Sequence, residues 1–334
     1  MSSTNGSLPQ SLKQPPFVVA MPTETVYGLA ARIDWPQGIE AIFKIKRRPF
    51  FDPLIVHVSS VKQAQQLTTD WLPAVDILAK ALWPGPITFV LPKSDLVDPM
   101  ITSGLDSVGV RMPRHPMALA LIDREGVPLA APSANLFGRT SPTSAAHVYS
   151  EFGTQVPVID GGECQIGLES TVLKVMSKQD VTELSILRPG AISKSEIEAV
   201  LKKESMAYRF VDTIERSLAP GQMKHHYMPS APLILVRTPG LARAQVIEIV
   251  KKQLDSLPES IDGVQLIRPK GFEKIFDLEM SSDPTLAART FYGNLRKVAE
   301  QNPDLILFQV QSFHRGEQWQ ALFDRLTKAS SIIV

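Results

Sequence analysis

Residues 44–57 read Lys44-Ile45-Lys46-Arg47-Arg48-Pro49-Phe50-Phe51-Asp52-Pro53-Leu54-Ile55-Val56-His57. Four cations stand within positions 44–48, at the end of a segment, residues 38–46, that we expect to be a helix. The β-branched, apolar run at residues 54–58 follows a proline and is typical of a buried strand. A helix followed by such a strand is part of a mixed pattern, without a strict βαβ rhythm, that predicts an α/β or α+β fold.

Similar short apolar runs continue on both sides of this stretch, between residues 17 and 211. Proline- and glycine-rich turns separate them at irregular intervals, which predicts mixed strands and helices in one domain. We expect strands at residues 17–21, 54–58, 87–91, 108–112, 127–131, 156–159 and 171–175, and helices at residues 38–46 and 74–82.

Residues 233–334 alternate more regularly, which predicts a smaller α/β domain of three layers with parallel strands. Its expected strands are residues 233–236, 263–267 and 304–308, and its expected helices are residues 241–254, 284–300 and 315–330. Residues 212–232 are expected to link the two domains. Their cationic and aromatic side chains favour a lid over a plain tether, with a static loop as the alternative. Residues 1–16 are expected to be a disordered lead-in.

Composition limits the classes of protein to consider. A chain of 334 residues suggests two domains at about 150 residues each. The net charge of +1 argues against a broad nucleic-acid-binding face. No apolar run approaches the ~18 residues of a membrane span, and residues 1–16 lack a signal-peptide pattern. The single Cys164 excludes an internal disulfide. We therefore expect a cytoplasmic protein without membrane association.

Several groups of residues could carry chemistry, and each has a plain structural alternative. Lys46 and Arg48 could capture an anion, or could simply solvate a helix C-terminus. Ser133 and Asn135 follow an apolar run, where they could bind phosphate or form an ordinary turn. Arg111 ends an apolar run, and a cation there needs a partner. The threonines at 23 and 25 could instead cap a helix.

The sequence lacks the common nucleotide and metal signatures, such as Gly-x-x-x-x-Gly-Lys-Ser/Thr, Gly-x-Gly-x-x-Gly and His-Glu-x-x-His. Its six histidines show no metal-ligand spacing, and we assign no metal ligand. A nucleotide would have to be bound by a less common device.

Nine motifs, in this order and spacing, resemble the YrdC-like domain of the threonylcarbamoyl-AMP synthases. They are Pro22-Thr-Glu-Thr-Val-Tyr-Gly-Leu29, Lys46-Arg-Arg48-Pro49, Pro53-Leu-Ile-Val-His57, Trp83-Pro-Gly-Pro-Ile-Thr88, Val108-Gly-Val-Arg111-Met-Pro113, Ala131-Pro-Ser133-Ala-Asn135, Ile159-Asp-Gly-Gly162, Gly167-Leu-Glu-Ser170-Thr171 and Leu187-Arg188-Pro-Gly190. The linker and the C-terminal part resemble the two-domain members of this family. The resemblance implies a twisted α/β domain with a concave basic pocket, followed by a Rossmann-like domain.

The resemblance also implies an activity, which is the synthesis of threonylcarbamoyl-AMP and pyrophosphate from L-threonine, bicarbonate and ATP. A nucleotidyltransferase of this kind would supply the tRNA threonylcarbamoyl-transfer machinery, with at most a weak contact to tRNA itself. Mg²⁺ would be held by the ATP phosphates. Lys46 and Arg48 would be catalytic. The ATP-binding residues would be Lys46, Arg48, Ser107, Ser133, Asn135, Ser141, Arg188 and Tyr227, and the threonine-binding residues would be Thr23, His57, Arg111 and Ser170.

Two other functions remain open at this point. One is a carbamoyl-transfer enzyme of another pathway, although such proteins carry zinc-finger-like modules that a chain with one cysteine lacks. The other is an RNA-binding module without catalysis, which the near-neutral charge disfavours.

Overall fold

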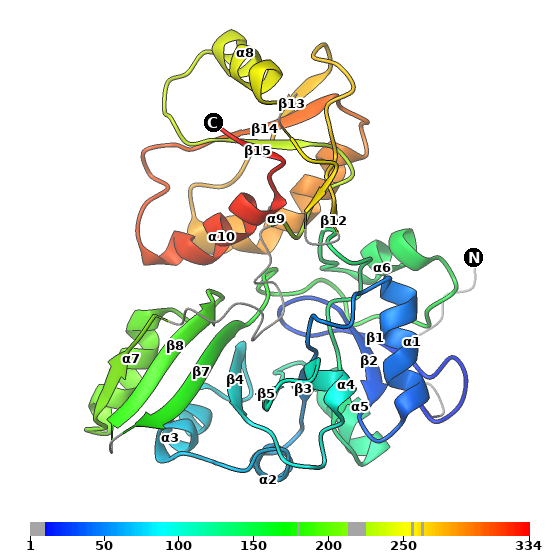
Figure 1. Ribbon diagram of the computed structural model, residues 1–334, viewed down its shortest axis with the longest axis vertical. Coiled ribbons are helices and arrows are strands. Elements are labelled where there is room, and N and C mark those ends of the chain that lie inside the picture. Colours follow the sequence, from blue (N-terminus) through cyan, green and yellow to red (C-terminus); the bar gives the residue numbers. More distant parts are fainter. Residues whose placement is uncertain (1–10, 179–180, 213–224, 255–256, 262–263) are drawn as a thin grey trace. The chain divides into compact units, whose positions relative to one another are not determined.

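The computed structural model describes residues 11–178, 181–212, 225–254, 257–261 and 264–334. The chain divides into two compact units (Figure 1). The first comprises the described residues of Met1–Leu136 and Pro142–Gln222, and the second those of Phe137–Ser141 and Met223–Val334. The second unit therefore includes five residues from the middle of the first unit's sequence. Most of the expected lid, residues 213–224, lies outside the described residues.

The first unit is built on a nine-stranded mixed sheet in the order β1-β2-β6-β3-β5-β4-β7-β8-β9. The pairs β3–β5, β4–β7 and β8–β9 are parallel, and the others are antiparallel. In chain order the strands are β1 (Val19–Met21), β2 (Gly28–Arg32), β3 (Ile55–His57), β4 (Ile87–Pro92), β5 (Ser107–Arg111), β6 (Leu129–Ala130), β7 (Thr171–Lys178), β8 (Val181–Arg188) and β9 (Tyr208–Phe210).

In the described part of the first unit, seven helices accompany this sheet. They are α1 (Pro36–Lys46), α2 (Val61–Gln66), α3 (Pro73–Leu82), α4 (Pro99–Thr102), α5 (Pro116–Glu125), α6 (Ala145–Phe152) and α7 (Lys194–Lys203). Four of them begin with proline, whose missing N–H costs nothing in the first turn. A capping box between Ser193 and Glu196 begins α7. Local sequence signals thus define where these helices start.

The two faces of the central strands differ in composition. Val56, Phe89 and Val110 belong to the large core that also contains side chains of α1, α3, α6 and α7. Because side chains alternate along a strand, Ile55 and Val90 lie on the opposite face, in a small separate cluster. No helical residue contributes to that small cluster. By the same alternation, this second face also carries His57 and Arg111.

The second unit contains a parallel sheet in the order β13-β14-β10-β15 and a short antiparallel hairpin, β11–β12. Its strands are β10 (Leu233–Val236), β11 (Ser260–Ile261), β12 (Val264–Gln265), β13 (Ile275–Asp277), β14 (Leu305–Gln309) and β15 (Ile332–Ile333). Its helices are α8 (Arg243–Leu254), α9 (Pro284–Ala299) and α10 (Gln320–Ala329), with a 3₁₀ turn, η1 (Glu317–Trp319), before α10. Figure 1 shows α8 on one side of the parallel sheet and α9 and α10 on the other.

The structure confirms the α/β class and corrects three local expectations. Residues 156–159 form no strand, and Val158 makes only an isolated bridge to Ala20. Of residues 263–267, Val264–Gln265 form a strand of the antiparallel hairpin, and β13 provides the parallel strand instead. No helix starts at Thr23, whose Oγ accepts the N–H of Val26 and donates to the same residue's carbonyl, which closes a turn.

Among the described residues, no helix combines the length and the apolar character needed to cross a membrane.

Gly190 tests the close approach between the chain after β8 and the backbone before β7. A Cβ atom there would lie 2.2 Å from the backbone nitrogen of Thr171 and 2.4 Å from the carbonyl carbon of Ser170, and backbone cannot yield as a side chain can. We expect Gly190→Ala to lower the free energy of unfolding by about 1–3 kcal/mol. Gly293→Ala, in α9 with open space around it, should raise it by about 0.5–1 kcal/mol. Urea denaturation measures both, and a fully stable Gly190→Ala variant would contradict the close approach.

Candidate functional site

Lys46 is the last residue of α1, which Arg47 ends in a left-handed conformation. Its side chain is 1% exposed, and Nζ donates to the carbonyls of Ser133 at 2.5 Å and Asn135 at 2.6 Å. Burial, together with the charge of Arg48, holds the pKa of Lys46 well below its ordinary value. An ammonium has three donors, so this arrangement has capacity for one further acceptor. Lys46 is therefore a buried group and not a solvated helix end.

Arg48 is held by the turn that follows it. Its guanidinium donates to the carbonyls of Asp52 and Pro53 at 2.9 and 2.7 Å and forms an ion pair with the Asp52 carboxylate at 2.9 Å. Burial raises the pKa of Asp52 in spite of the charges of Arg48 and Lys46. Asp52 was not among the residues expected at the site. Its position four residues after Arg48 could have indicated it, because a buried arginine requires a partner.

A second group joins the start of β7 to the end of β8. Arg188 donates to the carbonyl of Ser170 from Nε at 3.2 Å, and from Nη2 to the Ser170 hydroxyl at 3.1 Å. That hydroxyl also bonds to the hydroxyl of Thr88 at 2.8 Å. A residue expected to bind ATP and one expected to bind threonine are thus in direct contact.

Arg111, at the end of β5, has the partner that its apolar surroundings require. Its guanidinium donates to Glu24 at 2.7 Å, to the Thr25 hydroxyl at 2.9 Å and to the carbonyl of Gly85 at 3.3 Å. Burial alone would raise the pKa of Glu24, but the charge and hydrogen bond of Arg111 outweigh it and hold this pKa below its usual range. The hydroxyl of Thr25 also bonds to that of Thr23 at 2.9 Å.

Glu24 is the second residue that the sequence analysis missed. It lies between the two threonines of a motif already quoted, and it is 3% exposed. A carboxylate and a guanidinium that both fall in apolar contexts are candidates for one buried pair.

His57 lies beside Arg111, because the parallel register of β3 and β5 pairs these two positions. Its ring is 4% exposed. Burial, and then repulsion from Arg111, lower the pKa of His57 to about 3. The imidazole is therefore neutral near pH 7. Within the described part of the chain, its Nδ1 has no hydrogen-bond partner.

Three expected residues, Ser107, Ser141 and Tyr227, take no part in the contacts described so far. Ser107 begins β5 whereas Arg111 ends it, so about 13 Å of strand separates them. Ser141 and Tyr227 belong to the second unit. There the Tyr227 carbonyl accepts from the Thr140 hydroxyl at 3.3 Å, and its ring lies 5.2 Å from the Arg325 guanidinium. No group of three or more His, Cys, Asp or Glu side chains suited to a metal occurs among the described residues.

The lowered pKa of His57 predicts an acid-dependent loss of stability. Below pH 6.5 the unfolded chain binds a proton at this ring that the folded chain does not, so stability falls as pH falls from 6.5 towards 3. Between pH 7 and pH 5, the wild type should lose about 2 kcal/mol more than His57→Gln, which has no ring to titrate. Urea denaturation across this range measures the difference, and parallel curves for the two proteins would contradict a neutral buried His57.

Comparisons with known proteins assign the chain to a family. Residues 15–190 match the Sua5/YciO/YrdC family model, described as "Telomere recombination", and residues 192–331 match the model "Threonylcarbamoyl-AMP synthase, C-terminal domain". The chain is 38% identical over 320 residues to the threonylcarbamoyl-AMP synthase of Pyrococcus abyssi, covering 94% of this chain and 90% of the relative. It is 34% identical over 366 residues to the one of Schizosaccharomyces pombe, covering 96% and 87%.

A solved structure agrees with these matches over both parts of the chain. The crystal structure of P. abyssi Sua5 complexed with L-threonine has a TM-score of 0.75 at 36% identity, and the match covers 95% of this chain and 92% of that one. Both family models, the curated relatives and this structure therefore agree on one assignment: the chain belongs to the Sua5/YrdC family of threonylcarbamoyl-AMP synthases, in its two-domain form.

Proposed function

We propose that this enzyme forms threonylcarbamoyl-AMP and pyrophosphate from L-threonine, bicarbonate and ATP, and that the product serves the threonylcarbamoylation of adenosine in tRNA. The observation that carries the proposal is the set of buried cations in the first unit, Lys46, Arg48, Arg111 and Arg188. All three substrates are anionic or carry a carboxylate, so a site for them needs cations with fixed positions. The relative of known structure binds L-threonine.

The proposed reaction has two bond-forming steps. The amine nitrogen of threonine bonds to the carbon of bicarbonate, and water leaves, which gives a carbamate. A carbamate oxygen then attacks the α-phosphorus of ATP, and the bond to pyrophosphate breaks. Because the carbamate is already an anion, positioning and charge stabilisation contribute more than a strong base would. Mg²⁺ would enter with the triphosphate, whose oxygens are its preferred ligands.

The groups of the first unit suggest a division of this work. Lys46 and Arg48, with Ser133 and Asn135, would contact the phosphates, while Thr23, His57 and Arg111 would contact threonine. The neutral His57 would add no further positive charge beside Arg111, and its ring could accept or donate one hydrogen bond. Ser170 contacts Arg188 directly and would connect the two groups.

Labelled bicarbonate tests the reaction. With ATP, threonine and ¹⁴C-bicarbonate, we expect label to enter an adenylate and pyrophosphate to be released only when threonine is present. ATP hydrolysis that is independent of threonine, without a labelled adenylate, would overturn the proposal. Transfer from carbamoyl phosphate would favour the other carbamoyl chemistry instead.

Lys46 should be required for the rate of synthesis. Lys46→Met keeps an apolar side chain of similar length in the buried position and removes the charged donor, so synthesis should fall on the order of 100-fold. Lys44→Met is the matched control, because Lys44 is exposed on the same helix. Steady-state pyrophosphate release measures both variants. A Lys46→Met enzyme with the turnover of the control would remove Lys46 from the site.

Arg111 should govern the Michaelis constant for threonine more than that for ATP. The single variant Arg111→Gln also leaves Glu24 buried without its cation, which should cost about 3–5 kcal/mol of stability. The double variant Glu24→Gln/Arg111→Gln removes both charges and should recover much of that stability. Its KM for threonine should nevertheless stay raised, because glutamine cannot replace a two-pronged carboxylate contact. A stable double variant with normal KM for threonine would show that Arg111 does not bind the substrate carboxylate.

A further inference from the structure

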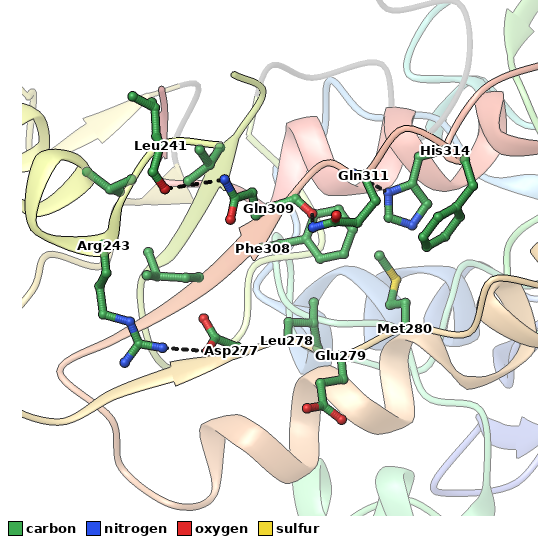
Figure 2. A pocket seen from close by; sticks show the side chains of 14 residues that line it. Leu241, Arg243, Asp277, Leu278, Glu279, Met280, Phe308, Gln309, Gln311 and His314 are labelled. Carbon is green, nitrogen blue, oxygen red and sulfur yellow. Dashed lines mark hydrogen bonds and ion pairs between the residues drawn. The ribbon is translucent and has the colours of Figure 1, made fainter. Parts of the chain in front are cut away.

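The second unit contains a pocket of about 470 Å³ that the proposed reaction does not use (Figure 2). It lies at the carboxyl ends of β10, β13 and β14, since Val236, Asp277 and Gln309 are the last residues of these strands and all three line it. A volume of this size suits a ligand larger than a single ion or an inorganic phosphate.

The sheet topology explains why a pocket forms there. After β10 the chain enters α8, whose Val246 and Val250 pack on the face that carries Leu307. After the adjacent β14 it continues to α10, whose Phe323 contacts Phe308, on the opposite face. The chain thus leaves two neighbouring parallel strands towards opposite faces, and the loops diverge. Such a point is where open parallel sheets form ligand-binding crevices.

His314, in the loop after β14, provides the observation that points to a ligand. Its Nδ1 accepts the backbone N–H of Gln311 at 2.9 Å, so in the neutral ring the proton is on Nε2. Burial lowers the pKa of His314, which favours that neutral form. The residue is 7% exposed, and Nε2 has no partner among the residues that the structure describes. A buried donor without an acceptor is costly unless a bound molecule supplies one.

The aromatic residues beside His314 define the apolar part of the pocket. The ring of Phe313 lies 4.3 Å from that of His314, and Phe313 is 47% exposed although it is a large apolar residue. Phe308 lies 5.3 Å from the same histidine and is buried. An exposed aromatic ring at the edge of a pocket is a surface on which a flat ring can stack.

The charges at the opposite end argue against a polyphosphate ligand. Arg243 is the one cation among the described residues of the lining, and it forms an ion pair with Asp277 at 2.5 Å (Figure 2). Glu279 adds a second carboxylate, so the lining carries a net charge of about −1. In the loop before α8, the Leu241 carbonyl accepts from the Gln309 side chain and the backbone N–H of Ala242 donates to the Gln245 side chain, so this N–H is not directed at a phosphate. Two carboxylates and one guanidinium suit neighbouring hydroxyl groups, which donate to the former and accept from the latter.

We propose that this pocket binds a neutral ribonucleoside. The flat base stacks on Phe313, and a ring nitrogen or carbonyl of the base accepts from Nε2 of His314. The two ribose hydroxyls bind at Asp277 and Glu279, where they also meet Arg243. This site is separate from the proposed synthesis in the first unit, and its test does not depend on that activity.

Nuclear magnetic resonance of the full chain, labelled with ¹⁵N at histidine, tests the proposal. The His314 signals are assigned by their loss in His314→Asn, in which the amide oxygen keeps an acceptor for Gln311 and no donor remains at the Nε2 position. Adenosine, guanosine, cytidine and uridine are each titrated to millimolar concentration. We expect at least one to shift the Nε2 signal of His314 saturably, and its 2′-deoxy counterpart to bind about tenfold more weakly, because one hydroxyl contact is lost.

Two variants separate binding at this pocket from binding elsewhere, with calorimetry as the readout. Asp277→Asn should bring the affinity for the ribonucleoside down to about that for the deoxy form, and His314→Asn should weaken it by about tenfold. Glu248→Gln, an exposed carboxylate of α8 outside the lining, should bind as the wild type does. No His314 shift with any of the four ribonucleosides would overturn the proposal. A shift caused instead by an amino acid such as leucine or phenylalanine would overturn it in favour of a zwitterion site.

Discussion

A guanidinium that leaves water must meet charge and hydrogen-bond acceptors in the protein, and Arg111 shows how much structure this requirement determines. Its three partners come from the turn after β1 and from the segment before β4, and Glu24 additionally accepts the backbone N–H of Arg114. Segments far apart in sequence are therefore joined at one cation. Lys46, Arg48 and Arg188 repeat the pattern with backbone carbonyls, so the candidate site is largely assembled by protein groups that satisfy buried cations.

The elements and site residues that could be predicted from the sequence are those whose signal lies in the neighbouring residues. The strand at residues 87–91 was predictable from its own β-branched residues, and the helices expected at 38–46 and 74–82 start within two residues of α1 and α3. β2 was missed because Gly28–Arg32 contains a glycine and two alanines, which have weak strand preference, and pairing with β1 and β6 makes it a strand. Glu24 and Asp52 were missed from the site for the same reason. Each is recognisable only from the partner that folding brings to it.

The pocket of the second unit is also recognisable only in the folded chain. No motif marks it, since its lining comes from three loops that meet because of the order of parallel strands. The expectation that 263–267 is a strand of the parallel sheet would have placed the loops differently. The order of the parallel strands, including β13, forms this pocket. The candidate site of the first unit, in contrast, was expected from short sequence motifs.

The contribution of Phe137–Ser141 to the second unit has a consequence for synthesis of the chain on the ribosome. The backbone N–H of Met228 donates to the Gly138 carbonyl at 2.8 Å, and that of Thr140 donates to the Met228 carbonyl at 3.2 Å. At about 5–20 residues per second, some 4–18 seconds of translation separate the emergence of these partners. During that time residues 142–222 of the first unit are synthesised, while the five-residue segment lacks its final contacts. The nascent first unit must therefore tolerate an incomplete stretch in its own middle, and cotranslational folding of this chain cannot be strictly sequential.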